Sequence, residues 1–110
     1  MQIIRLPRRG GKTTKCLEIL RDNEKSVMFC HVSLAILHLE HEILDKNPEI
    51  KKRIFTTNEY EQRLRGMNID TIVIDNADLM PTSVLLGMIN YFVSVPIMGQ
   101  ICKLVITTTE

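Results

Sequence analysis

A short segment near the N-terminus carries residue types that suit phosphate chemistry. Residues 6–14 read LPRRGGKTT, between an apolar run and a helix-like stretch. In such a turn, inward-facing backbone N–H groups and the positive N-terminal end of the following helix form a cavity for anions. In a phosphate-binding loop, the lysine reaches the β- and γ-phosphates and the next hydroxyl binds Mg²⁺. The spacing therefore predicts these two roles for Lys12 and Thr13.

The match to the full loop pattern, G-x-x-x-x-G-K-[ST], is incomplete because Leu6 stands where the first glycine is expected. A basic turn in front of a helix is the simpler alternative. The strand-to-helix context favours a phosphate-binding loop. Its predicted nucleotide-binding residues are Arg8, Arg9, Gly10, Gly11, Lys12, Thr13 and Thr14.

A second candidate feature is Asp75, which directly follows the apolar and β-branched residues 71–74. Mg²⁺ usually binds one or two carboxylates together with phosphate oxygens and waters. We therefore predict that Thr13 and Asp75 are the metal ligands. An ordinary turn at the end of a strand is the alternative, since Asp-Asn is common in turns.

Strands and helices are expected to alternate along the chain. The predicted strands are residues 2–6, 26–32, 53–56, 69–74 and 103–107. The predicted helices are residues 13–21, a helix capped by Ser33 that ends before Pro48, 58–65 with Gly66 as its stop, and 82–93. This alternation predicts an α/β fold with a parallel sheet, in which ligands bind beyond the carboxyl ends of the strands. Both candidate features lie at that edge.

Length and composition favour a single domain covering residues 1–110. With 45% hydrophobic and 25% charged residues, the chain is expected to fold rather than remain disordered. A net charge of +1 gives no overall argument for a nucleic-acid or membrane partner. The sequence shows no signal-peptide pattern or membrane span, and its three cysteines form no C-x-x-C pair, so we expect a cytoplasmic protein.

Taken together, residues 11–13 and 72–75 resemble the Walker A and Walker B motifs of P-loop NTPases. The form RRGGKTT is similar to the ATPase domains of phage terminase large subunits and related superfamily 2 helicase-like motors. The resemblance implies a three-layer αβα, RecA-like core with a mainly parallel sheet of about five strands, either minimal or truncated. It also implies binding and hydrolysis of ATP with Mg²⁺, in a viral DNA-packaging or helicase-like motor.

The same resemblance implies further roles and partners. Arg8 corresponds to an arginine that senses or stabilises the γ-phosphate, and Thr108 lies in a threonine run, 107–109, that resembles the coupling motif of these motors. DNA, further copies of the chain or a larger motor complex are the implied partners, and the host cytoplasm is the implied location if the protein is viral. No membrane partner is expected.

One departure from the family pattern bears on catalysis. These motors usually have a glutamate after the Walker B aspartate, and Asn76 occupies that position. Asparagine can orient a water molecule but cannot accept its proton at neutral pH. Asp78 is the nearest other carboxylate. The catalytic candidates are therefore Arg8, Asn76, Asp78 and Thr108, and nucleotide binding is better supported than turnover.

Two other functions remain as alternatives, and a third is disfavoured. A catalytically weak or inactive P-loop interaction or regulatory protein fits Asn76 and the short chain. A small-molecule kinase would need an arginine-rich lid, which is not found after Asp75. A GTPase is disfavoured because the sequence contains no Asn-Lys-x-Asp motif.

Weaker features favour structural interpretations. His38 and His41 could share a helix face, but no zinc-like ligand spacing supports a metal site. The apolar segment 80–93 is expected to pack in the core, with a partner contact as the alternative. The basic residues expected on a solvated surface, rather than on a DNA track, are Lys46, Lys51, Lys52, Arg53, Arg63 and Arg65.

Overall fold

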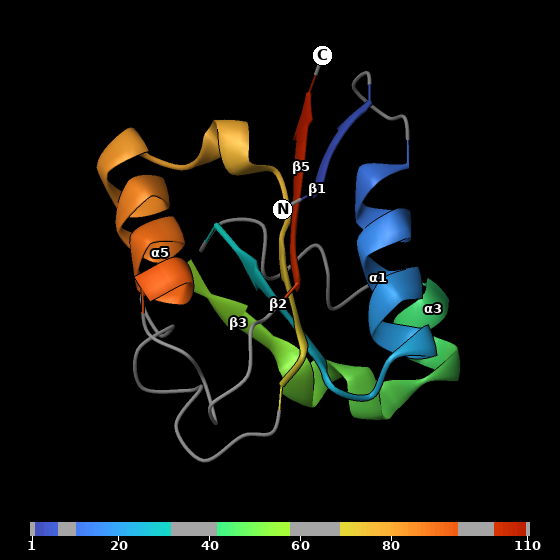
Figure 1. Ribbon diagram of the computed structural model, residues 1–110. Coiled ribbons are helices and arrows are strands. Elements are labelled where there is room, and N and C mark those ends of the chain that lie inside the picture. The colour runs from blue at the N-terminus through green and yellow to red at the C-terminus, as the bar shows by residue number, and fades with distance from the viewer. Residues whose placement is uncertain (1, 7–10, 32–41, 58–68, 95–102, 110) are drawn as a thin grey trace.

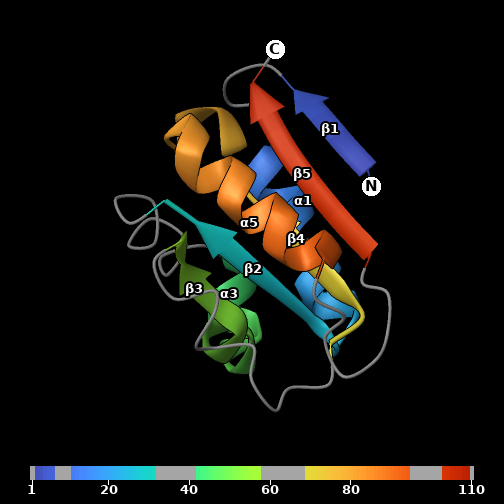
Figure 2. The same ribbon diagram turned by 60° about the vertical axis from the view of Figure 1, so that its left-hand side comes forward.

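A parallel sheet forms the centre of the protein (Figures 1 and 2). The computed structural model describes residues 2–6, 11–31, 42–57, 69–94 and 103–109. Within them the strands are β1 (Gln2–Leu6), β2 (Ser26–Cys30), β3 (Ile54–Thr56), β4 (Thr71–Ile74) and β5 (Lys103–Thr109). They lie in the order β1-β5-β4-β2-β3, and every neighbouring pair is parallel. The predicted α/β fold with a parallel sheet of five strands is therefore confirmed.

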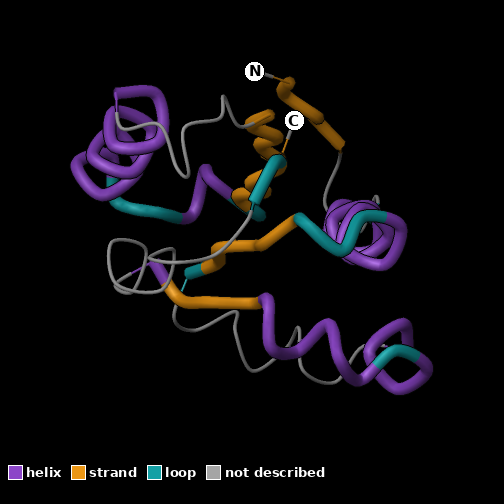
Figure 3. The backbone as a smooth tube through the Cα atoms, turned by 60° about the horizontal axis from the view of Figure 1, so that its bottom comes forward, coloured by secondary structure: helices purple, strands orange, loops and turns teal. Residues whose placement is uncertain are grey.

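Helices cover both faces of this sheet (Figures 1 and 3). Helices α1 (Lys12–Asp22) and α3 (Glu42–Lys46) lie on one face, and α5 (Thr82–Ser94) lies on the other. Two 3₁₀ helices, η1 (Pro48–Arg53) and η3 (Ala77–Leu79), complete the described helices. This arrangement of layers agrees with the expected three-layer architecture.

The alternation of side chains along each strand divides the core into two clusters. On the α1 face, Leu17 and Leu20 pack with Met28, Val73 and Val105. The cluster on the α5 face contains Val27, Phe29, Ile72, Ile74, Met88, Leu104 and Ile106. All residues of β2 and β4 are buried, as expected for apolar strands covered on both faces.

The apolar segment 80–93 packs only partly in the core. Met80 and Met88 are buried, as the prediction requires, but Leu86 on α5 is 54% exposed. Leu79, on the preceding 3₁₀ helix, is 55% exposed. These two leucines are therefore exposed large apolar side chains in the described part of the chain.

Strand positions were predicted more accurately than strand ends. Strand β1 matches its prediction, whereas β2 ends at Cys30 and β4 begins only at Thr71. Strand β5 continues to Thr109, beyond the predicted end at residue 107. The predicted helices 13–21 and 82–93 correspond to α1 and α5, but neither 3₁₀ helix was predicted.

Arg53 contradicts two predictions. It is the last residue of η1 rather than the first residue of a strand, and it is only 8% exposed. Its guanidinium donates hydrogen bonds to backbone carbonyls at the end of α1 and the start of β2. These carbonyls need partners when buried, so the basic side chain turns inward. The neighbouring Lys51 and Lys52 are exposed, as predicted.

Several predictions fall on residues outside the described ranges. These are the Ser33 cap and the N-terminal part of its helix, the pair His38 and His41, and the helix 58–65 with Gly66. The same holds for Arg8, Arg9 and Gly10 of the loop.

Candidate functional site

Gly11 sets the start of helix α1. Its φ is +83°, in the left-handed region that favours glycine, and it is the N-cap residue. Its carbonyl accepts a hydrogen bond of 2.9 Å from the backbone N–H of Lys15. The first turn of α1 itself contains no acidic side chain. Lys12, at the first helical position, is only 7% exposed.

Asp75 lies at the carboxyl end of β4 and is completely buried. Its backbone N–H donates a hydrogen bond of 3.0 Å to the carbonyl of Phe29, which extends the pairing of β4 with β2. Its side chain lies on the α1 face, because Val73, two residues earlier, packs in the cluster on that face.

Thr13 contacts Asp75 directly. The Thr13 hydroxyl donates a hydrogen bond of 3.1 Å to Oδ2 of Asp75, across 62 positions of sequence. This contact brings together the two predicted metal ligands, one from the helix after β1 and the other from the end of β4. The sheet order makes the contact possible, since all strands end at the same edge.

Two side chains outside the predicted site hold the other oxygen of Asp75. The hydroxyl of Thr107, on β5, donates a hydrogen bond of 2.6 Å to Oδ1. The Cys16 thiol, on α1, donates to the same oxygen at 3.5 Å. Both residues are completely buried. Burial raises the pKa of the Cys16 thiol well above its usual value, and the charge of Asp75 raises it further, so the thiol stays protonated and remains a donor.

Asn76 adopts a backbone conformation that restricts the choice of residue. Its φ is +53°, in the left-handed region, where asparagine is better tolerated than most side chains. Its backbone N–H donates a hydrogen bond of 2.9 Å to the Thr107 hydroxyl. The asparagine therefore has a conformational explanation that is independent of catalysis, and a glutamate in its place would be strained.

Three of the remaining predicted site residues, Thr14, Asp78 and Thr108, belong to the described part of the chain. Thr14 is half-buried on α1, and Asp78 is exposed on η3. Thr108 follows the buried Thr107 on β5, so the alternation of the strand places it on the opposite face from Asp75. Arg8, Arg9 and Gly10 lie outside the described residues, so their positions relative to Asp75 stay predictions.

The donor set at this edge fits Mg²⁺. Asp75 and Thr13 provide one carboxylate and one hydroxyl, both oxygen donors, which suits an ion that takes its other ligands from phosphates and waters. Within the described ranges, no three His, Cys, Asp or Glu residues are grouped so that they could hold a metal ion.

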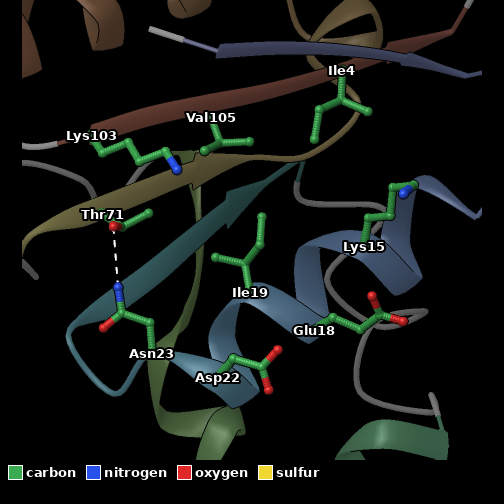
Figure 4. A pocket seen from close by; sticks show the side chains of 9 residues that line it. All are labelled: Ile4, Lys15, Glu18, Ile19, Asp22, Asn23, Thr71, Lys103 and Val105. Carbon is green, nitrogen blue, oxygen red and sulfur yellow. Dashed lines mark hydrogen bonds between the residues drawn. The ribbon is translucent and has the colours of Figure 1, made fainter.

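A cavity of about 400 Å³ lies elsewhere on the α1 face (Figure 4). Ile19 of α1, Ile4 of β1 and Val105 of β5 form its apolar part, and Lys15, Glu18, Asp22 and Lys103 surround it. Asn23 and Thr71 also line the cavity, and the Asn23 amide donates a hydrogen bond of 3.2 Å to the Thr71 hydroxyl. Asp75 and Thr13 do not line this cavity, so it is not the predicted phosphate site.

Comparison with protein-family models gives no match, and comparison with curated proteins gives none either. In the described part of the chain, no helix is both long and apolar enough to cross a membrane.

Proposed function

We propose that this chain is a P-loop NTPase domain that binds ATP with Mg²⁺ at the carboxyl edge of its sheet. The observation that carries the proposal is the hydrogen bond of 3.1 Å between Thr13 and Asp75, which joins the Walker A-like and Walker B-like segments. The left-handed Gly11, the helix that begins directly after it and the buried Lys12 support the same assignment.

Each residue of the proposed site has a distinct task. Backbone N–H groups at the start of α1 and the ammonium of Lys12 bind the phosphates, and Arg8 or Arg9 approaches the γ-phosphate. Thr13 and Asp75 hold Mg²⁺, which supplies positive charge that offsets the charge of the phosphates. Catalysis in such a site consists mainly of positioning and charge stabilisation.

The motor assignment is the finer part of the proposal. The resemblance of residues 8–14 to terminase and helicase-like ATPases supports a RecA-like core acting in viral DNA packaging or on DNA more generally. A DNA motor of this kind should hydrolyse ATP faster when DNA is present. ATPase rates measured with and without DNA, over a range of protein concentrations, test both this and dependence on self-association.

Binding itself is tested with two lysine variants on the same helix. Lys12→Ala removes the ammonium assigned to the phosphates, and we expect the affinity for ATP·Mg²⁺ to fall at least about tenfold, since charged hydrogen bonds contribute about 1.5–3 kcal/mol each. Lys15→Ala is the matched control, because Lys15 lies three residues later on the same helix and its side chain is exposed. Equal affinities of wild type and Lys12→Ala, measured by isothermal titration calorimetry, would remove the basis of the assignment.

A second candidate is a P-loop protein that binds nucleotide without hydrolysing it. The conformation of Asn76 favours this candidate, because the position after Asp75 disfavours the glutamate that activates water in related motors.

Asn76→Glu and Asn76→Ala separate the two candidates, since both variants accept about 1 kcal/mol of left-handed strain but only one adds a carboxylate. If the wild type hydrolyses ATP, the second candidate is wrong. Turnover that appears only in Asn76→Glu identifies a motor core that lacks its base. If neither the wild type nor the variants turn over while ATP binds, the non-hydrolysing candidate holds.

A further inference from the structure

The two oxygens of the Asp75 carboxylate have different environments. Oδ2 accepts a hydrogen bond of 3.1 Å from Thr13, the residue assigned to Mg²⁺. Oδ1 accepts hydrogen bonds of 2.6 Å from Thr107 and 3.5 Å from Cys16. The donors to Oδ1 come from β5 and α1, so two elements of the fold meet at this one oxygen.

We propose that Thr107 and Cys16 are positioning residues, which anchor Oδ1 of Asp75 so that Oδ2 faces the divalent cation together with Thr13. The inference rests on the proposed function, because it assigns an orientation to the metal ligand of that site. In this proposal Oδ1 is the anchored oxygen of the carboxylate and Oδ2 is the oxygen that binds the cation.

The arrangement of donors favours this division. A carboxylate can rotate about its terminal bond, and two donors from different directions fix the plane of the group. Thr107 is itself held, because its hydroxyl oxygen accepts a hydrogen bond of 2.9 Å from the backbone N–H of Asn76. The Cys16 thiol also lies 4.0 Å from the Thr107 hydroxyl, which completes a compact group around Oδ1.

Burial determines how these two residues can act. Thr107 and Cys16 both have 0% exposure, so they reach a bound nucleotide only through Asp75. Residues behind a metal ligand orient that ligand, and their loss typically costs about 10–100-fold in metal affinity. The expected effect therefore concerns the metal dependence of binding rather than nucleotide binding as such.

The test measures ATP affinity with Mg²⁺ and with EDTA, and the ratio of the two affinities reports the metal contribution. Thr107→Val removes the hydroxyl at nearly constant shape, and we expect this ratio to fall at least about tenfold. Cys16→Ala removes the weaker thiol donor, and a fall of about three- to tenfold is expected. Thr107→Ser and Cys16→Ser keep a donor and should stay within about threefold of the wild-type ratio.

Two matched controls make the same chemical changes elsewhere in the core. Thr71→Val removes a buried threonine hydroxyl at the start of β4, where it donates to Asp70 rather than to Asp75. Cys30→Ala removes a completely buried thiol that donates to the Phe55 carbonyl at 3.7 Å. Both controls should keep the wild-type ratio, and the test and control variants alike should keep the wild-type affinity in EDTA.

The outcomes separate this inference from the proposed function. A wild type that binds no ATP overturns the proposed function and the inference with it. A wild type whose binding depends on Mg²⁺, with the same ratio in Thr107→Val and Cys16→Ala, overturns the inference alone. Equal losses in the test variants and their controls also overturn it, because general loosening of the core would then explain the effect. If Cys16→Ala does not fold, Thr107→Val decides the result.

Discussion

Helix α1 has a buried charged side chain beside each of its ends, and the two are held in different ways. At the C-terminal end, the Arg53 guanidinium donates to the carbonyls of Leu20, Asn23 and Ser26 at 2.7, 2.8 and 3.1 Å, and on its more exposed side it also pairs with the Glu49 carboxylate at 3.2 Å. At the N-terminal end, the Asp75 carboxylate accepts from the side chains of Thr13, Thr107 and Cys16. Each charge has the sign that the adjacent helix end favours.

The difference lies in the partners. Backbone carbonyls at a helix end are fixed acceptors with no other use, so Arg53 completes the hydrogen bonding of the fold. The partners of Asp75 are hydroxyl and thiol groups, and a hydroxyl such as that of Thr13 can rotate to present its oxygen lone pairs to a cation. We infer that Arg53 serves stability and that Asp75 serves a ligand. Variants of the two residues test this contrast.

Arg53→Ala is expected to have the largest effect on stability. Removing the guanidinium leaves buried carbonyls at the end of α1 and the start of β2 without their donor, and losses of this kind cost about 3 kcal/mol or more. Chemical denaturation should show a correspondingly lower free energy of unfolding.

The controls for this variant lie in the same segment. Lys52→Ala alters the preceding, exposed side chain and should change stability by less than about 0.5 kcal/mol. Arg53→Lys keeps the charge but lacks the fork of donors, so it should recover only part of the loss. If Arg53→Ala is as stable as Lys52→Ala, the inference that Arg53 stabilises the fold is wrong.

Asp75→Asn should show the opposite profile, with a small effect on stability and a large effect on metal-dependent binding. The amide oxygen can still accept from Thr107 and Cys16, and the amide nitrogen can donate to the Thr13 oxygen. Replacing a buried charge also removes its desolvation penalty, so the free energy of unfolding should stay within about 1 kcal/mol of wild type. The enhancement of ATP affinity by Mg²⁺ should be lost. A loss of stability comparable to that of Arg53→Ala would show that Asp75 is structural as well.

The same contrast explains what the sequence could predict. Continuous apolar runs indicated the buried parallel strands. The glycine-lysine-threonine spacing together with Asp75 predicted the pair that the structure brings into contact. Arg53 could not be distinguished from its neighbours Lys51 and Lys52, because the backbone carbonyls that it binds lie 27 to 33 positions away. Its ion pair with Glu49, four positions earlier, is of a kind that also occurs between exposed residues.

Thr107 was missed for a different reason. Strand β5 pairs Val105 with Val73, and continuing this register brings Thr107 level with Asp75. A shift of one residue would instead have brought Thr108 there. The hydrophobic pattern that normally fixes register does not exclude this shift, because residues 104–106 are all apolar and both faces of the strand are covered. Cys16 lies one helical turn after Thr13, so it was the member of the group that helical spacing alone could have indicated.

Asp70 provides the smallest expected effect, and it extends the comparison to a carboxylate that is not fully buried. The hydrogen bond of 2.8 Å from the Asn23 amide, beside the C-terminal end of α1, is the main reason that the pKa of Asp70 lies below its usual value. The ionised form is therefore favoured in the folded state. The stability that the ionised Asp70 carboxylate contributes is fully present above the unfolded pKa of about 3.9. It disappears as the pH falls through the lower pKa of the folded state.

Thermal unfolding of wild type and Asp70→Asn between about pH 2 and pH 7 measures this contribution. The stability difference should be no more than about 0.5 kcal/mol at neutral pH, because water screens the group, and it should shrink toward zero in acid. Asn23→Ala removes the main donor, so in an Asn23→Ala background the effect of Asp70→Asn should lose most of its pH dependence. A difference that grows as the pH falls would contradict the assigned sign. The protonated carboxyl would then be the form that the folded state favours.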